Sequence, residues 1–319
     1  MTVSIIIAVK TWQDNLEECV AKCLELDFSD FEILVLPDHP LNKNLETSGV
    51  RIIPTGTISP AQKRDIAMSY AKGEILAFLD DDAYPAKDWL KNAIRNFIDP
   101  EVVAVGGPAI TPENDNLRQK ASGLVYASFL VSAKFIYRYL PKKKREVDDY
   151  PSCNFLIRKD VIQELGGFRT SFWPGEDTKL CLDITKRLGK KIIYDPTVLI
   201  YHHRRPLFLP HLEQVANYAL HRGYFVKRYP QTSLRISYFI PSLFLLFILG
   251  GGIFTWFLSS LKIIYLFSLF LYLLLVSIFS LNKGLFMIPL IFSGIILTHL
   301  TYGFNFIKGL LSRRLKEEK

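Results

Sequence analysis

Three long apolar runs in the last third of the chain limit most strongly what it can fold into. "ISYFIPSLFLLFILGGGIFTWFLSS" covers residues 236–260, a second run covers 263–281 and a third covers 284–307. The first run has no charged residue and exceeds the roughly 20 residues that cross a bilayer. Only one or two polar residues separate the runs, which does not suit a soluble helical core. We therefore predict about three transmembrane helices within residues 233–310.

The composition agrees with a membrane setting. Of the 319 residues, 49% are hydrophobic, and the net charge is +8. A basic chain suits phospholipid headgroups or phosphorylated substrates. Nucleic acid is the competing partner, but we recognise no nucleic-acid motif and expect none to bind. The basic run "PKKKRE" at residues 141–146 is either a solvated loop or a contact with anionic lipid. Residues 206–232 mix aromatic and basic side chains, which is typical of an interfacial amphipathic linker, and residues 311–319 form a basic tail.

Residues 1–205 have a different pattern, in which strand and helix signals alternate. Apolar strands are expected at residues 3–9, 31–36, 50–53 and 74–79. The spacing of Leu16, Cys19 and Cys23 predicts a helix with both cysteines buried as small apolar residues. Ser59 and Gln62 form a capping box that opens a helix to about residue 71. This alternation predicts an α/β domain with a mainly parallel, Rossmann-like sheet.

Three consecutive carboxylates, Asp80, Asp81 and Asp82, follow the fourth expected strand. Ligands of parallel sheets bind outside the carboxyl ends of the strands, so these residues fall on the functional edge. Mg²⁺ or Mn²⁺ would compensate their charge, because both ions prefer carboxylate and water oxygens. An ordinary acidic turn is the alternative.

A second acidic site lies in "GEDTKLCLDITKRLGKK", residues 175–191. Glu176 and Asp177 begin an expected helix, where acidic residues commonly cap the N-terminus. The other interpretation is a general base, which must be ionised to accept a proton.

Four segments together resemble a known family: "VSIIIAVK", "PAQKRDIAMSYAKGEILAFLDDDAYPAKDWL", "CNFLIRKDVIQELGGF" and "WPGEDTKLCLDITKRLG". They are similar to the successive motifs of inverting family 2 glycosyltransferases with a GT-A fold, over about residues 2–205. The apolar tail is similar to that of enzymes of envelope polysaccharide synthesis, including the succinoglycan type. The resemblance implies transfer of one sugar from a UDP- or GDP-linked donor to a polyprenyl-linked or glycan acceptor, with Mg²⁺ or Mn²⁺ as cofactor.

The resemblance also implies roles for the residues at matching positions. In the nucleotide pocket it places Ala8, Val9, Lys10, Asp38, Lys63, Arg64, Asp80 and Asp81. Arg64 would lie near the base or diphosphate, and Asp80 would contact the ribose or support the metal. It places Asp82 with His202 or His203 at the metal, Arg204 and Arg205 at the diphosphate, and Asn154 and Trp173 at the acceptor. Asp177 would be the catalytic base, with Glu176 beside it.

Three departures from the family pattern bear on these roles. "LPDHP", residues 36–40, replaces the commoner Asp-Asp-Gly-Ser segment, which weakens the assignment of Asp38 to base recognition. Asp65 stands where Asn is usual. The segment from Leu207 lacks the QxxRW signature of processive synthases, which favours transfer of a single sugar.

The orientation in the membrane follows in part. The N-terminus "MTVSIIIAVK" has no basic region of a signal peptide, and basic residues precede the first apolar run, so we expect a cytosolic catalytic domain at the inner membrane. Three full crossings would place the basic tail outside; a third segment lying in the interface would keep it inside.

A non-catalytic nucleotide-sugar-binding scaffold is the rival function. A channel or transporter is disfavoured, because the apolar runs carry almost no ionisable residues.

Overall fold

The chain folds into two compact units. The structure is a computed structural model and describes residues 1–41, 49–281 and 284–318. The first unit, here called the sheet unit, comprises residues 1–110 and 137–203, and the second, the helical unit, comprises residues 111–136 and 204–317. The predicted boundary at residue 205 left residues 111–136 in the first domain, whereas the structure groups them with the C-terminal helices.

An eight-stranded mixed sheet, in the order β3-β2-β1-β4-β9-β6-β10-β8, forms the centre of the sheet unit. The neighbouring strands β1 to β4 are mutually parallel, as the alternation of strands and helices predicts, and β9 runs antiparallel between β4 and β6. A small second sheet has the order β5-β11-β7. The strands are β1 Val3–Ala8, β2 Phe31–Leu36, β3 Val50–Ile52, β4 Ile75–Asp80, β5 Ala83–Pro85, β6 Val102–Gly106, β7 Ala109–Ile110, β8 Arg145–Val147, β9 Asn154–Arg158, β10 Lys191–Tyr194 and β11 Ile200–His202.

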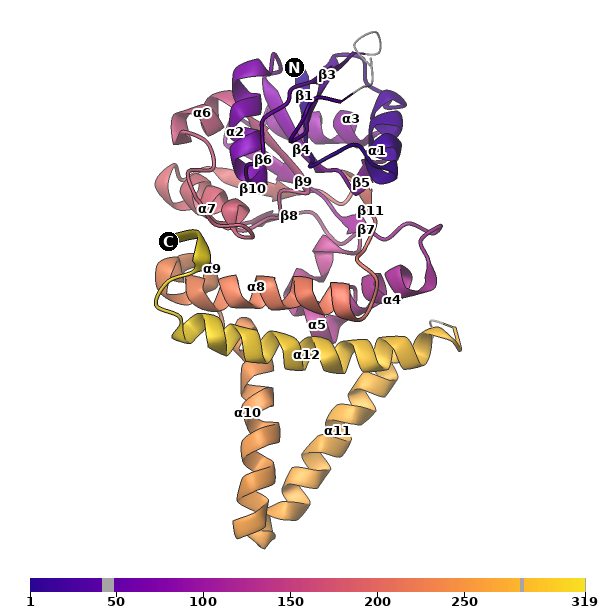
Figure 1. Cartoon of the computed structure of the whole chain (residues 1–319), viewed down its shortest axis with the longest axis vertical. Helices are drawn as coiled ribbons and strands as arrows, with labels where there is room; N and C mark the ends of the chain where they lie inside the picture. The colour runs from indigo at the N-terminus through magenta and orange to yellow at the C-terminus, as the bar shows by residue number, and fades with distance from the viewer. Residues whose placement is uncertain (42–48, 282–283, 319) are drawn as a thin grey trace. The chain divides into compact units, whose positions relative to one another are not determined.

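Helices cover both faces of the large sheet (Figure 1). One apolar core joins α1 and α3 to the strand residues of one face, and it includes the fully buried Cys19 and Cys23, as predicted. On α2, the backbone N–H of Gln62 donates to Ser59 Oγ and the side chain of Gln62 accepts from Ser59 N, so the predicted capping box is confirmed. The helices of this unit are α1 Asp14–Leu24, α2 Pro60–Tyr70, α3 Trp89–Ile94 with η2 Arg95–Ile98, α6 Lys159–Leu165, and α7 Glu176–Leu182 with η4 Asp183–Arg187; η3 Ala133–Arg138 joins the units in sequence.

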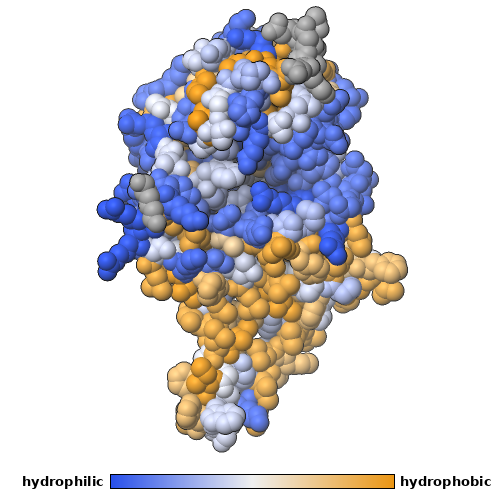
Figure 2. Space-filling model, viewed as in Figure 1, coloured by the Kyte–Doolittle hydropathy of each residue, from blue (hydrophilic) through white to orange (hydrophobic). Residues whose placement is uncertain are grey.

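Two long helices, α8 and α12, lie side by side in the helical unit, and α10 and α11 extend away from α12 and converge at their far ends (Figure 1). Hydrophobic side chains cover α10 and α11 (Figure 2). The elements are α4 Leu117–Tyr126, α5 Phe129–Ser132, α8 Leu209–Arg228, α9 Pro230–Ser233, α10 Ile236–Phe257, η5 Ser259–Leu261, α11 Lys262–Ser280, α12 Met287–Leu311 and η6 Lys316–Glu318.

Glycines and a buried histidine bring α8 and α12 together. A Cβ added at Gly309 of α12 would collide with the carbonyl oxygen of Leu220 on α8, so only glycine allows this approach. His211 of α8 is fully buried, and its ring nitrogens lie 2.8 Å from Ser122 Oγ on α4 and 2.9 Å from Thr298 Oγ1 on α12. Burial, together with the charge of Arg204, lowers the pKa of His211 to about 4.

Candidate active site

The predicted functional edge forms where the parallel strands end. The register places Ala8 beside both Leu36 and Asp80, so β1, β2 and β4 finish in one row. Asp80 is the last residue of β4, and Asp81 and Asp82 follow it in a turn. The apolar run of β4 fixes this position, because its residues before Asp80 are buried between the two helical layers.

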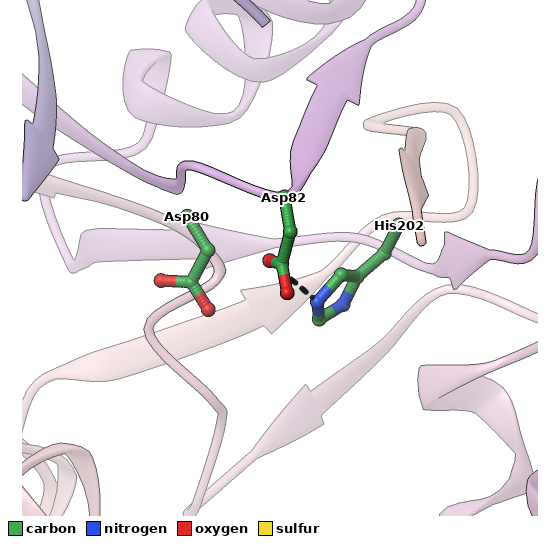
Figure 3. A group of neighbouring side chains, drawn as sticks. All are labelled: Asp80, Asp82 and His202. Atoms are coloured by element: carbon green, nitrogen blue, oxygen red, sulfur yellow. Dashed lines mark ion pairs between the residues drawn. The ribbon is translucent and has the colours of Figure 1, made fainter. Parts of the chain in front are cut away.

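Asp80, Asp82 and His202 gather at this edge (Figure 3). One donor atom from each residue lies within 4.8 Å of the others. His202 is the last residue of β11 in the small sheet. This strand pairs antiparallel with β5, so His202 lies opposite Ala83. His202 Nε2 is 3.0 Å from Asp82 Oδ1. Two carboxylates and an imidazole form a donor set that suits a divalent cation.

Asp81 and His203 have partners outside this group. Gln13 Nε2 donates to Asp81 Oδ2 at 2.5 Å, and burial with the neighbouring Asp82 and Asp80 charges raises the pKa of Asp81 to about 7. His203 Nε2 lies 2.7 Å from Glu18 Oε2 on α1. Of the two histidines proposed for the metal, His202 is therefore the one with the matching geometry.

Lys63 joins three groups at the ends of β1 and β2. Its Nζ donates to the carbonyl oxygens of Val9 at 2.5 Å and Leu36 at 3.1 Å, and it pairs with the carboxylate of Asp38. The Lys63 ammonium lowers the pKa of Asp38. The side chain of Lys63 is buried, so it fixes the strand ends, while Lys10 is exposed and Ala8 half-buried.

The second acidic site lies in the same unit, at the start of α7. Glu176 is buried, and its carboxylate accepts from Arg64 Nη1 at 2.9 Å and from the backbone N–H of Gly175 at 3.0 Å. Asp177 is only half-buried, and it accepts from Thr178 N at 2.7 Å and, more loosely, from Ser152 N at 3.4 Å. Asp177 is therefore the more accessible of the two carboxylates.

Asn154 and Trp173, both expected at the acceptor, have opposite environments. Asn154 is fully buried: its amide donates to the carbonyl oxygens of Gly107 and Val198, and it accepts from Trp89 Nε1. These bonds assign Asn154 to the fold and not to acceptor binding. The side chain of Trp173 is 50% exposed, which suits a contact with a ligand.

Arg204 and Arg205, expected at the diphosphate, begin the second segment of the helical unit. Arg204 is buried and Arg205 is exposed. Sequence reasoning missed Gln13, Glu18 and Ser152, which contact site residues from elements far away in the chain. Their sequence neighbourhoods carry no motif that would have indicated this role.

Comparison with known proteins identifies the family. The family model described as "Glycosyl transferase family 2" matches residues 4–166, about half of the chain. The chain therefore belongs to glycosyl transferase family 2. The match includes β1, α2 and the aspartates after β4.

Curated relatives are similar over part of their lengths. A pre-mycofactocin glycosyltransferase of Mycobacterium tuberculosis is 26% identical over 203 residues, which are 63% of this chain and 40% of the relative. A glucosyl-dolichyl phosphate glucuronosyltransferase of Haloferax volcanii is 23% identical over 184 residues, 55% of this chain and 53% of the relative. The chain thus spans about half the length of these relatives, or less.

A solved structure supports the fold. A mannosyltransferase from Pyrobaculum calidifontis, in complex with GDP-Man and Mn²⁺, superposes with a TM-score of 0.55 at 18% identity, covering 98% of this chain and 88% of that chain. The likeness confirms the predicted GT-A-like domain with a mainly parallel sheet, followed by long apolar helices.

Proposed function

We propose that the protein is a membrane-bound, metal-dependent, inverting glycosyltransferase. It moves one sugar from a nucleotide-diphospho-sugar to a lipid-linked or glycan acceptor in the synthesis of envelope glycolipid or polysaccharide. The observation that carries the proposal is the cluster of Asp80, Asp82 and His202 at the carboxyl edge of the sheet, in the same unit as the accessible Asp177. The Haloferax relative named for a dolichyl-phosphate-linked sugar favours a polyprenyl-linked acceptor, and the Pyrobaculum complex favours a donor of the GDP-Man type.

The donor set fits a resident cation. Asp80, Asp82 and His202 would hold it, and the imidazole favours Mn²⁺ over Mg²⁺, which prefers oxygen ligands. When bound, the cation supplies positive charge opposite the diphosphate that leaves. Asp38 and Lys63 would lie at the base end of the donor.

Asp177 acts on the acceptor. An acceptor hydroxyl is a weak nucleophile, and Asp177 accepts its proton as the oxygen attacks the anomeric carbon of the sugar. The bond between this carbon and the diphosphate oxygen breaks, the electron pair leaves with the nucleoside diphosphate, and the single displacement inverts the anomeric centre. Glu176 does not compete for the proton, because Arg64 and the Gly175 N–H occupy its carboxylate.

Release of nucleoside diphosphate from a panel of UDP- and GDP-sugars, with and without polyprenyl-phosphate-linked acceptor, tests the function. We expect acceptor-dependent release with one donor in Mn²⁺. Asp177→Asn should keep donor affinity and lose about 10²- to 10⁴-fold in kcat, whereas Asp183→Asn, on the same helical segment, should retain the rate. A protein that binds a donor, yet neither transfers nor hydrolyses it, would be the scaffold that we kept as the alternative.

The helical unit provides the membrane anchor. By length and composition three helical segments could cross a bilayer: 236–257, 259–280 and 287–318. The 22 residues of α10 are about 33 Å long, which matches the roughly 30 Å hydrocarbon core. The exposed Trp256 and the charge of Lys262 lie near the α10–α11 connection, where they suit the far membrane interface. We assign α10 and α11 to two crossings.

The third segment, α12, has a different role. It packs along α8 from Thr298, beside His211, to Ser312, whose carbonyl accepts from Lys227 Nζ at 2.6 Å. If α12 crossed the bilayer, α8 with its several charged side chains would have to enter it as well, at high cost. The face of α12 away from α8 exposes large apolar side chains, including Phe304 and Leu311. We infer that α8 and α12 lie together in the interface.

This arrangement returns the C-terminal tail to the side of α8, which we propose to be cytosolic. Labelling of single-cysteine variants in intact cells with an impermeant thiol reagent tests it. Ser260→Cys, at the exposed α10–α11 connection, should react, and Lys316→Cys, in the exposed part of the tail, should be protected until the membrane is permeabilised. Reaction of Lys316→Cys in intact cells would instead support three full crossings.

A further inference from the structure

One buried arginine joins the two acidic sites of the sheet unit. Arg64 of α2 is 4% exposed. Its Nη2 donates to Asp80 Oδ1 at 2.9 Å and its Nη1 donates to Glu176 Oε1 at 2.9 Å. Asp80 belongs to the metal-binding group and Glu176 precedes the proposed base, so the two ends of one guanidinium contact both halves of the proposed site.

Aromatic side chains hold this guanidinium in place. Its centre lies 5.9 Å from the ring centroid of Phe78 and 5.7 Å from that of Phe168. The neighbouring Asp65 accepts a hydrogen bond from Phe168 N at 2.9 Å, which fixes the second ring relative to α2. The guanidinium is therefore enclosed by two rings and two carboxylates. The two carboxylates and the two rings thus account for the position of Arg64, which the family resemblance places near the base or diphosphate.

Glu176 connects Arg64 to the turn that begins α7. Its Oε1 also lies 3.4 Å from Ser152 Oγ, and its Oε2 accepts from Gly175 N. Ser152 contacts Asp177 as well, through its backbone N–H. A short chain of contacts thus links Arg64 to Asp177.

We propose that Arg64 is a positioning residue that couples order at the metal-binding edge to order at the turn 175–178. The proposal rests on the proposed function, since it takes Asp80 as part of the metal site. A guanidinium is planar and rigid, so its two hydrogen bonds fix the positions of two carboxylates relative to each other. A lysine ammonium acts as a single point charge and does not do this. Fixing Asp80 restricts the guanidinium, and the guanidinium restricts Glu176, which would otherwise be a buried charge without its counter-ion.

Hydrogen–deuterium exchange of the full-length protein in detergent, with Mn²⁺ alone as probe, tests the coupling. In the wild type, Mn²⁺ should slow exchange in peptides that cover 79–85 and also, by about tenfold, at 175–178. Arg64→Met should keep the first effect and lose the second, and Arg64→Lys should show a reduced second effect. Arg158 provides matched controls, because its guanidinium packs on Phe97 and donates to backbone carbonyls. Arg158→Met and Arg158→Lys should behave as the wild type.

The outcomes separate the coupling from the function. Full protection of 175–178 in Arg64→Lys, or in a folded Arg64→Met, overturns the coupling. Protection of 79–85 alone in the wild type also overturns it but leaves the metal site and the transferase in place. Protection of neither segment overturns the metal assignment and the coupling together. In kinetics, we expect Arg64→Lys to lower kcat about 10²-fold with little change in donor KM, a split that general loss of folded protein would not produce.

Discussion

The two units of the molecule differ in the balance of their charged residues and in the partners of their buried polar side chains. The sheet unit has 23 Lys and Arg against 26 Asp and Glu, whereas the helical unit has 15 against 4. In the sheet unit, buried charges lie in pairs, such as Lys63 with Asp38 and Arg64 with Glu176. In the helical unit, the buried contacts between helices use mostly neutral groups, such as His211 with Thr298.

We attribute this difference to what each unit is proposed to bind. A site for a cation and a diphosphate needs carboxylates at fixed positions, and pairing with buried cations holds some of them in place. A surface that meets lipid needs a net positive charge near the headgroups and no unpaired charge between its helices. We therefore expect changes in the sheet unit to alter chemistry, and changes in the helical unit to alter stability and membrane attachment.

The largest effect should come from Asp82→Ala. It removes one of three candidate metal donors, and we expect a loss of about 10³-fold in the rate of transfer, with an unchanged melting temperature and unchanged membrane association. Isothermal titration with Mn²⁺ and a transfer assay measure it. Asp88→Ala, at an exposed carboxylate after the same strand, is the matched control and should keep both metal affinity and rate. Full activity of Asp82→Ala would show that Asp82 is not needed to hold the metal, and that the chemistry assigned to the sheet unit does not depend on this group.

The next prediction concerns pH and the helical unit. Burial and Arg204 lower the pKa of His211 to about 4 in the folded protein, against roughly 6.5 when unfolded. The unfolded state therefore binds more protons, and the free energy of unfolding falls as the pH decreases from about 6.5 to about 4. The loss should approach 3 kcal/mol over this range, at about 1.4 kcal/mol for each unit.

Thermal unfolding in detergent across this pH range measures the effect. His211→Gln removes the titrating group and should flatten the dependence, although it should also lower the stability at pH 7.5, because the bonds to Ser122 and Thr298 change. Equal slopes for wild type and variant would show that another group causes the acid sensitivity.

A third effect, of about 1 to 3 kcal/mol, should follow from Gly309→Leu. The new side chain would collide with the backbone of α8 at Leu220, and so separate α8 from α12. Gly250→Leu on α10 is the control, since the nearest atom to its added Cβ, in Phe254, is 4.0 Å away. Yield and melting temperature in detergent should fall for Gly309→Leu alone. Donor binding by the protein that remains folded should persist, because the sheet unit is unchanged; a parallel loss of donor binding would mean that the units do not act separately.

The comparison also shows which features the sequence could predict. The three aspartates could be placed at the sheet edge because alternating strands and helices imply parallel pairing, and parallel strands end together. The position of Arg64 could not, since its contact with Glu176 joins residues 112 positions apart and no local pattern records it. Residues 111–136 contain the capped helix α4, but no local pattern shows that it groups with the C-terminal helices.

The third apolar segment illustrates the same limit. Its length and hydropathy match a transmembrane helix, and these properties do not distinguish crossing a bilayer from lying on it. The distinction depends on which face is covered, and by what. The buried face of α12 carries Gly309 and Thr298, which are matched to the backbone and the histidine of α8. Such a match between two helices becomes visible only when both are placed.

The smallest effect should follow from Asp65→Asn in the sheet unit. Asp65 accepts a hydrogen bond from Phe168 N at 2.9 Å, and burial raises the pKa of its carboxyl. Because the folded pKa is raised, the carboxyl group of Asp65 contributes most to stability below its unfolded pKa of roughly 3.9, where it is protonated. This contribution is lost as the pH rises through the folded pKa and the buried group becomes charged. The carbonyl oxygen of Asn can accept the same hydrogen bond without the cost of burying a charge.

We expect Asp65→Asn to raise the stability by about 0.5 to 1 kcal/mol at pH 7.5 and by less at pH 4, measured by chemical denaturation. The direction is opposite to that of His211, whose burial destabilises at low pH. A variant less stable at pH 7.5 would show that the charge of Asp65 itself supports the neighbouring Arg64, and that buried charges in the sheet unit act as one network.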